Sequence, residues 1–170
     1  MKLLLFFTSV LLFTQLQAQE TLDDLLNKYN NNKIPYITAQ ELATPKIKAI
    51  LLDAREANEY KVSHLKDAVF VGYDHFKVKN IKKQIQKKDT LIVVYCSLGI
   101  RSETISHKLK KAGYTNVKNL YGGIFEWKNN GFSVYNEKEK ATDSIHTFSY
   151  EWSKWLKAGK KVYPKNNINE

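Results

Sequence analysis

The amino-acid sequence predicts an α/β fold in which helices cover both faces of a central parallel sheet. Two observations predict it. Short apolar runs rich in β-branched residues, of which residues 91–95 (LIVVY) are the clearest, alternate with segments whose apolar residues recur every three or four positions. Strands that are apolar throughout indicate a parallel sheet, because its strands are buried on both faces. The length of 170 residues suits one domain with a substantial core.

Each element of this sheet follows from a local pattern. The predicted strands are residues 49–53, 69–71, 91–95 and 117–120. The apolar residues of the two predicted helices are Val78, Ile81 and Ile85 in one and Ile105, Leu109 and Ala112 in the other. Gly113 ends the second helix, since glycine readily adopts the left-handed conformation that closes a helix.

Two segments flank this central domain, which we place at residues 34–136. Residues 19–33 are predicted to be an N-terminal helical segment, in which Thr21 can cap a short helix. Residues 137–170 are predicted to form a C-terminal amphipathic helix, which Asp143 caps, and a loose tail from Lys160. The apolar residues of that helix are Ile145, Phe148, Trp152, Trp155 and Leu156. Its apolar side either covers the domain core or contacts a partner protein or a second copy of the chain.

Residues 1–18 have the pattern of a secretory signal peptide. Lys2 supplies the positive start, residues 3–13 are mostly apolar but too few to span a bilayer, and Ala18 is a small residue suited to the cleavage site. We therefore expect cleavage near Ala18. The mature protein is expected in a periplasm or outside the cell, with no membrane span.

Composition and charge argue against several functions. The net charge of +10 is spread along the chain, and aromatic residues do not interleave with a basic stripe. This pattern argues against nucleic-acid binding and suits a surface that attracts small anions. The glycine-rich phosphate loops of nucleotide-binding proteins are absent from the sequence. Cys96 is the only cysteine, which excludes an intramolecular disulfide, and the four scattered histidines predict neither a metal nor a cofactor.

Cys96 is the strongest candidate for chemistry. It follows the predicted strand at residues 91–95 and precedes a helix that begins near Ser102, so it lies at the sheet edge where α/β folds bind ligands. The N-terminus of that helix favours the nucleophilic thiolate. Gly99 permits a tight turn in which backbone amides converge, and Arg101 adds a cation suited to an oxyanion. The alternative is a structural cysteine at the end of a core strand.

Three motifs resemble those of the rhodanese family of sulfurtransferases, over residues 34–136. The first motif is residues 51–60 (LLDAREANEY) and 64–68 (HLKDA), which resemble the family's L-D-x-R-x-x-x-E-[YF] stretch and the G-H-I-x-G-A segment that follows it. The second is residues 96–101 (CSLGIR), which resemble the active-site loop C-x-x-G-x-R. The third is residues 119–127 (NLYGGIFEW), which resemble the closing motif N-L-x-G-G-I-x-x-W. Ser63 and Asp67 stand where the family has glycine. These two departures concern the shape of a turn that is remote in sequence from the thiol.

The resemblance implies a rhodanese-like three-layer fold and a sulfur relay. Cys96 would take a sulfane sulfur from thiosulfate or another persulfide donor, carry it as a persulfide, and pass it to a thiol or to cyanide. The residues that would bind the substrate around this sulfur are Ser97, Leu98, Gly99, Ile100, Arg101 and Ser102. Arg101 would steer the anionic donor. The main role of Ser102 would be to cap the helix, and its lesser role would be to line the pocket.

The resemblance also implies roles around the loop. Asp53 would support the loop from the neighbouring strand. Arg55 would either pair with Glu59 or Asp67 or bind the donor. The residues that would pack behind the loop are Gly122, Gly123 and Trp127.

Two other functions stay open at this point. Phosphatases and arsenate reductases also use a cysteine loop that ends in arginine, but their loops place five residues between the two, and here Cys96 and Arg101 are separated by four. A rhodanese-like module that only binds a partner could use the C-terminal tryptophans as its contact surface. An intact cysteine loop argues against such a module, which needs no thiol.

Overall fold

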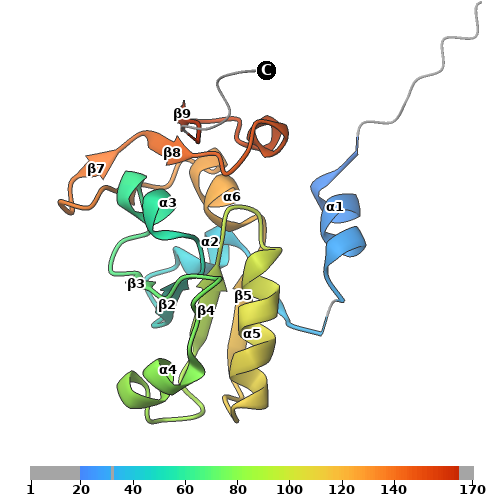
Figure 1. Cartoon of the computed structure of the whole chain (residues 1–170), viewed down its shortest axis with the longest axis vertical. Coiled ribbons are helices and arrows are strands. Elements are labelled where there is room, and N and C mark those ends of the chain that lie inside the picture. Colours follow the sequence, from blue (N-terminus) through green and yellow to red (C-terminus); the bar gives the residue numbers. More distant parts are fainter. Residues whose placement is uncertain (1–19, 32, 165–170) are drawn as a thin grey trace, which may run out of the picture.

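In the computed structural model, which describes residues 20–31 and 33–164, a parallel five-stranded sheet forms the centre (Figure 1). Its strand order is β1 (Tyr36–Ile37), β5 (Val117–Leu120), β4 (Ile92–Tyr95), β2 (Ile50–Asp53) and β3 (Val69–Phe70). All four pairings are parallel. Strand β4 is buried along its whole length, which explains its uninterrupted apolar sequence. The parallel sheet and the four strands predicted from the sequence are confirmed.

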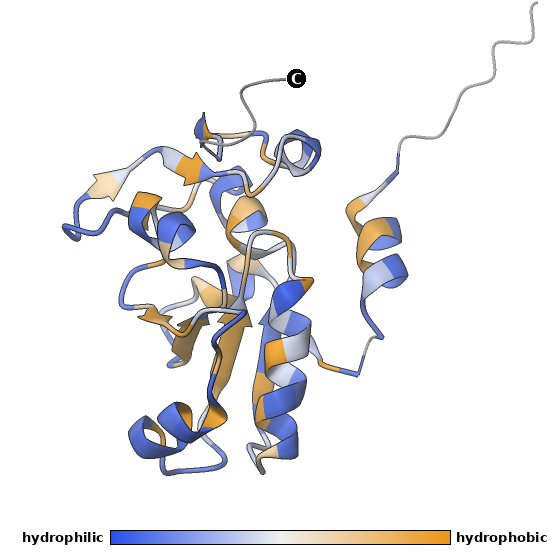
Figure 2. Cartoon of the chain, in the orientation of Figure 1, coloured by the Kyte–Doolittle hydropathy of each residue, from blue (hydrophilic) through white to orange (hydrophobic). Residues whose placement is uncertain are grey.

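Helices cover both faces of the sheet. They are α1 (Leu22–Tyr29), α2 (Ala39–Leu42), α3 (Ala57–Val62), α4 (Val78–Gln84), α5 (Arg101–Lys111) and α6 (Gly123–Asn129). Alternate residues of β4 point to opposite faces, so Ile92 and Val94 pack with α4 and α5, whereas Val93 and Tyr95 pack with α6. In Figure 2 the strands are correspondingly apolar and the outer sides of α4 and α5 are hydrophilic. The three layers that the sequence predicts are therefore confirmed.

Helix α1 begins as the sequence predicts. The Thr21 hydroxyl accepts a hydrogen bond from the Asp24 N–H at 3.1 Å, and the Asp24 carboxylate accepts one from the Thr21 N–H at 3.0 Å. This reciprocal pair satisfies backbone donors that the first turn would otherwise leave open. Leu25 and Leu26 are buried, so α1 is attached to the domain through its apolar side.

The predicted C-terminal amphipathic helix is wrong. The chain instead forms β8 (Ser144–His146), the 3-10 helix η1 (Glu151–Trp155) and β9 (Lys160–Val162), and β8 pairs in parallel with β9. A short antiparallel pair, β6 (Val134–Tyr135) and β7 (Ala141–Thr142), precedes them. A continuous helix is not possible because Phe148 has a φ of +65°, in the left-handed region. We call residues 143–164 the C-terminal arm.

The arm covers the domain, which is one of the two roles expected for it. Ile145 and Leu156 are buried in the same core as β4 and α6, with Trp152 and Trp155 packed against them. Because Lys160–Val162 is a strand, the expectation of a loose tail from Lys160 is wrong for these residues. The predicted signal peptide at residues 1–18 and the end of the tail at residues 165–170 lie outside the described residues. In the described part of the chain, no helix is long and apolar enough to cross a membrane.

Candidate active site

Cys96 lies directly after β4, at the edge of the sheet where the parallel strands end. The chain then turns through residues 97–100, and α5 begins at Arg101 (Figure 1). The Cys96 side chain has 0% of its surface exposed. The sequence therefore placed the thiol correctly, between a buried strand and the N-terminus of a helix, where unpaired N–H groups point towards it.

Backbone and side-chain donors converge on the sulfur. The Gly99 N–H donates a hydrogen bond to the Cys96 Sγ at 3.1 Å, and the Ser102 Oγ lies 3.5 Å from it. Burial alone would raise the pKa of Cys96, but the Arg101 charge and the hydrogen bonds from Ser102 and Gly99 outweigh it and hold the pKa below its ordinary value. The site thus favours the thiolate, which is the nucleophilic form of cysteine.

Gly99 is held at its carbonyl, which belongs to the peptide unit after the one that carries its N–H. Its carbonyl accepts hydrogen bonds from the side-chain amide of Asn119 at 2.8 Å and from that of Asn30 at 3.0 Å. Gly99 itself has a φ of +101°, and a Cβ there would lie 3.2 Å from the Leu120 carbonyl oxygen. A left-handed glycine at this position therefore keeps the N–H directed at the sulfur.

Ser102 does not cap the helix, so that expectation is wrong. Helix α5 begins one residue earlier and Ile100 occupies the cap position. The Ser102 hydroxyl instead shares its proton between two acceptors, the Asn119 Oδ1 at 2.7 Å and the Cys96 Sγ at 3.5 Å. Asn119 thus orients both Ser102 and Gly99. Sequence reasoning gave Asn119 no role, although it is the first residue of the motif at residues 119–127.

The guanidinium of Arg101 is paired with Glu59 of α3. Its Nη1 donates to Glu59 Oε2 and its Nη2 to Oε1, both at 2.7 Å, and the Ser97 hydroxyl donates to Oε1 at 3.0 Å. Burial would raise the pKa of Glu59, but the hydrogen bonds and charge of Arg101 hold it below the ordinary value. Glu59 is therefore an ionised partner of the loop. Its position in the motif at residues 51–60 is the signal that could have indicated this.

Arg55 is held by Asp53 and not by Glu59 or Asp67. Both side chains are wholly buried, with Arg55 Nη2 at 2.6 Å and Nε at 3.0 Å from the Asp53 carboxylate. Burial would lower the pKa of Arg55, but Asp53 raises it above its ordinary value. The Asp53 carboxylate therefore braces Arg55 and reaches the loop only indirectly. Arg55 thus makes a structural pair through Nε and Nη2, while its Nη1 is buried and has no hydrogen-bond partner among the described residues.

Helix α6 holds the cysteine loop through two backbone hydrogen bonds. The Ile124 N–H donates to the Cys96 carbonyl at 2.9 Å, and the Phe125 N–H donates to the Ser97 carbonyl at 3.2 Å. Gly123 makes this approach possible, because a Cβ there would lie 2.2 Å from the Cys96 carbonyl oxygen. Gly122 also has a positive φ, of +65°. Both glycines thus have the packing role expected for them.

The other loop residues are closed in as well. Ser97 and Leu98 are buried, Ile100 is partly buried, and Trp127 packs on Phe132 at the far end of α6.

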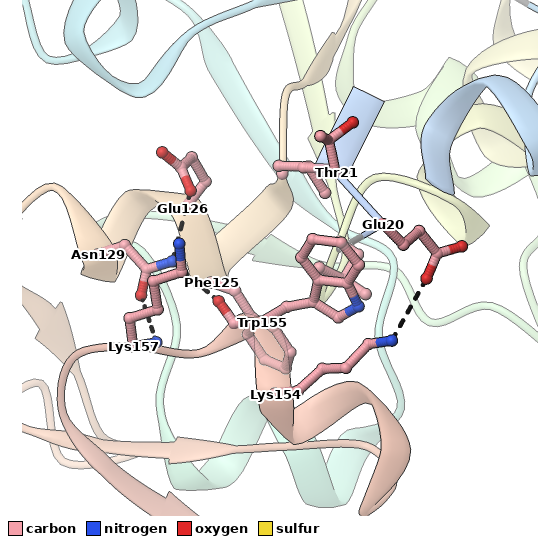
Figure 3. Close-up of a pocket in the computed structure, with 11 residues that line it drawn as sticks. Glu20, Thr21, Phe125, Glu126, Asn129, Lys154, Trp155 and Lys157 are labelled. Carbon is pink, nitrogen blue, oxygen red and sulfur yellow. Dashed lines mark hydrogen bonds and ion pairs between the residues drawn. The ribbon is translucent and has the colours of Figure 1, made fainter. Parts of the chain in front are cut away.

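A cavity of about 340 Å³ lies on the Leu98 side of the loop, between the start of α1, α6 and η1 (Figure 3). Figure 3 shows Trp155 and Phe125 along this cavity, with an ion pair between Lys154 and Glu20, which also line it. Within residues 20–31 and 33–164, no cluster of three or more His, Cys, Asp or Glu side chains could hold a metal ion.

Comparison with known proteins agrees with this geometry. The family model described as rhodanese-like domain matches residues 35–130. A curated relative, tRNA uridine(34) hydroxylase of Onion yellows phytoplasma (strain OY-M), is 36% identical over 117 residues, which cover 66% of this chain and 36% of the relative. The protein of the same name from Staphylococcus epidermidis (strain ATCC 12228 / FDA PCI 1200) is 40% identical over 80 residues, 44% of this chain and 24% of the relative. The chain therefore spans about a third of the length of the first relative and about a quarter of the second.

Solved structures show the same fold. Thiosulfate sulfurtransferase from Pseudomonas aeruginosa superposes with a TM-score of 0.56 at 22% identity, over 72% of this chain and 23% of that one. A rhodanese-related protein from Thermoplasma volcanium superposes with a TM-score of 0.53 at 24% identity, over 61% of this chain and 99% of that one. At this level of identity the similarity establishes the fold alone.

Proposed function

The chain belongs to the family of rhodanese-like domains, and we propose that it is a sulfurtransferase that carries a sulfane sulfur as a persulfide on Cys96. One observation carries this proposal. The Cys96 sulfur is buried at the start of α5, accepts the Gly99 N–H, and has a pKa below its ordinary value. A single sulfur atom added to it would remain next to the helix N-terminus, which stabilises an anion.

The reaction takes two displacements. In the first, the Cys96 thiolate attacks the outer sulfur of the donor, so that a Sγ–S bond forms and the bond between that sulfur and the donor breaks. The donor leaves with the electron pair, as sulfite from thiosulfate or as a thiolate from an organic persulfide. In the second, a thiol or cyanide attacks the outer sulfur and Cys96 leaves as the thiolate.

The names of the curated relatives do not change this proposal. They are called tRNA uridine(34) hydroxylase, and this chain corresponds to 36% and 24% of the two described above. The family match at residues 35–130 contains the cysteine loop, whose chemistry we derive from Cys96, Gly99 and Ser102. Sulfur transfer is the reaction that these three residues support best.

Mass spectrometry of the protein after exposure to a sulfur donor tests the proposal. We expect the mass to increase by one sulfur atom, located on the peptide that contains Cys96, and to return to its starting value when cyanide is added. Cys96→Ser should gain nothing while keeping its fold, because a hydroxyl and a thiol differ little in volume. If neither thiosulfate nor an organic persulfide loads the parent protein, or if Cys96→Ser is loaded equally, the proposal is wrong.

The same samples separate the two other functions. A phosphatase would hydrolyse an aryl phosphate, which we do not expect of a loop with four residues between Cys96 and Arg101. A module that only binds a partner would neither take up sulfur nor hydrolyse the ester.

We also propose that the protein is exported and cleaved after Ala18, on the sequence pattern of residues 1–18. N-terminal sequencing of the protein recovered from its natural host tests this. Gln19 is the expected first residue of the mature protein, and a chain that still begins at Met1 would contradict export through this segment.

A further inference from the structure

The C-terminal arm reaches the candidate active site, although it lies outside the family match at residues 35–130. Strand β8 packs on α3, the helix that carries Glu59, and the ring of Phe148 covers the guanidinium of Arg101. The Arg101 Cζ lies 4.3 Å from the centre of this ring, within the range of a cation–π interaction. In Figure 1 the arm crosses the edge of the sheet where β4 ends and α5 begins. The site is therefore built from two parts of the chain.

Phe148 is held in a conformation that its own sequence disfavours. Its φ of +65° is uncommon for a bulky residue and costs free energy. The turn is fixed on both sides: the Phe148 N–H donates to His146 Nδ1 at 3.1 Å, and the Thr147 N–H donates to the Val162 carbonyl at 2.9 Å. The ring also packs on Trp152, with 5.0 Å between the ring centres. Strain of this kind persists only where the surroundings impose it, and it gathers at functional sites.

The positive charges at the site are already matched. Glu59 binds both terminal nitrogens of Arg101, and Asp53 binds Arg55. Among the described residues, two guanidinium nitrogens are buried without a hydrogen-bond partner, Nε of Arg101 and Nη1 of Arg55. Arg101, whose charge acts on Cys96, offers only its Nε–H as a free donor, which suits a single sulfur anion. It does not suit a donor that brings two negative charges, because those would lie near the Glu59 carboxylate.

We propose that Phe148 is a specificity-determining residue, which makes the site select organic persulfides over thiosulfate. This inference rests on the proposed sulfur transfer at Cys96. Where the thiolate that leaves an organic persulfide carries an apolar group, that group can pack on the exposed part of the Phe148 ring; 38% of this residue is exposed. The sulfite that leaves thiosulfate is a dianion, and it would have to form against the same ring without an unpaired cation.

The test compares how fast two donors load Cys96. One donor is benzyl hydropersulfide, whose organic group is uncharged, and the other is thiosulfate. Mass spectrometry follows the loading with time, and the readout is the ratio of the two second-order rate constants. Phe148→Gly removes the ring and relieves the left-handed strain, so that folding is not endangered. We expect this variant to shift the ratio about tenfold towards thiosulfate, since the ring no longer covers the guanidinium.

Two variants serve as controls. Phe148→Leu keeps an apolar cover, and Tyr150→Ala removes an aromatic ring from the same arm that is 71% exposed and lies against Tyr163. Both should keep the ratio within about twofold of the parent. The inference is overturned if Phe148→Gly loads with both donors at the parental ratio, or if Tyr150→Ala shifts the ratio as far as Phe148→Gly does. Failure of both donors to load the parent would instead overturn the proposed function.

Discussion

Replacing Gly123 by alanine should disrupt the cysteine loop without touching the sulfur. A Cβ at this position would lie 2.2 Å from the Cys96 carbonyl oxygen and 2.7 Å from the carbonyl carbon and oxygen of Ser97. These are backbone atoms, which cannot rotate away as the end of a side chain can. They also accept the N–H groups of Ile124 and Phe125, so any shift stretches the two hydrogen bonds that attach the loop to α6.

The expected cost has two parts. Gly123 has a φ of +57°, and a side chain in the left-handed region costs about 1–2 kcal/mol. Forcing a methyl group into a closed space adds about 1–3 kcal/mol. Gly131 provides the matched control, because it has a φ of +81° but no atom of the described residues lies within 4 Å of an added Cβ. Gly131→Ala should therefore lose only the first part.

Equilibrium unfolding in urea and sulfur loading of Cys96 measure the two effects. Gly123→Ala should be less stable than Gly131→Ala by about 1–3 kcal/mol, and it should load more slowly, whereas Gly131→Ala should load at the parental rate. The reasoning is refuted if the two variants unfold at the same urea concentration and load equally fast. In that case the contact between α6 and the loop does not control the site.

Three further predictions concern the charges around the loop. Ser102→Ala should raise the pKa of Cys96, measured as the pH dependence of thiol alkylation, because the serine is one of the groups that hold this pKa down; an unchanged profile would contradict this. Asp53→Asn should destabilise the fold by about 3–5 kcal/mol in urea unfolding, because Arg55 would remain buried without its carboxylate; a loss below about 1 kcal/mol would exclude a buried charge pair. Burial lowers the pKa of His146, so the unfolded chain binds the proton more readily and stability should fall as the pH drops below about 6.5; this slope should be smaller in His146→Asn.

The sequence predicted the centre of the fold because burial leaves a local pattern there. Strand β4 and helix α5 carry apolar residues at the spacings that a covered sheet requires, and Thr21 caps α1 through its near neighbour Asp24. Strand β1 is only two residues long and exists through its pairing with β5, more than 80 positions further along the chain. No local pattern marks a strand of this kind.

The structure of the C-terminal arm differs from the predicted helix for a related reason. Its apolar residues have helical spacing, but the chain at Phe148 is left-handed and β8 is held by β9. The parts of the site that come from other elements were missed in the same way. Glu59 and Asn119 reach the cysteine loop through the topology of α3 and β5, which the order of residues alone does not show.

Arg101 is the strongest of the groups that lower the pKa of Cys96, and Glu59 moderates the charge that it presents to the sulfur. Because Glu59 binds both terminal nitrogens of Arg101, the two side chains act on the sulfur as a dipole, weaker at a distance than a free cation. The N–H of Gly99, at 3.1 Å, is the close contact. Asn119 holds the following peptide unit through the Gly99 carbonyl, and α6 holds the carbonyls at the start of the loop. Residues that never touch the sulfur therefore contribute to its reactivity through the loop, and the role that we propose for Phe148 concerns the choice of donor.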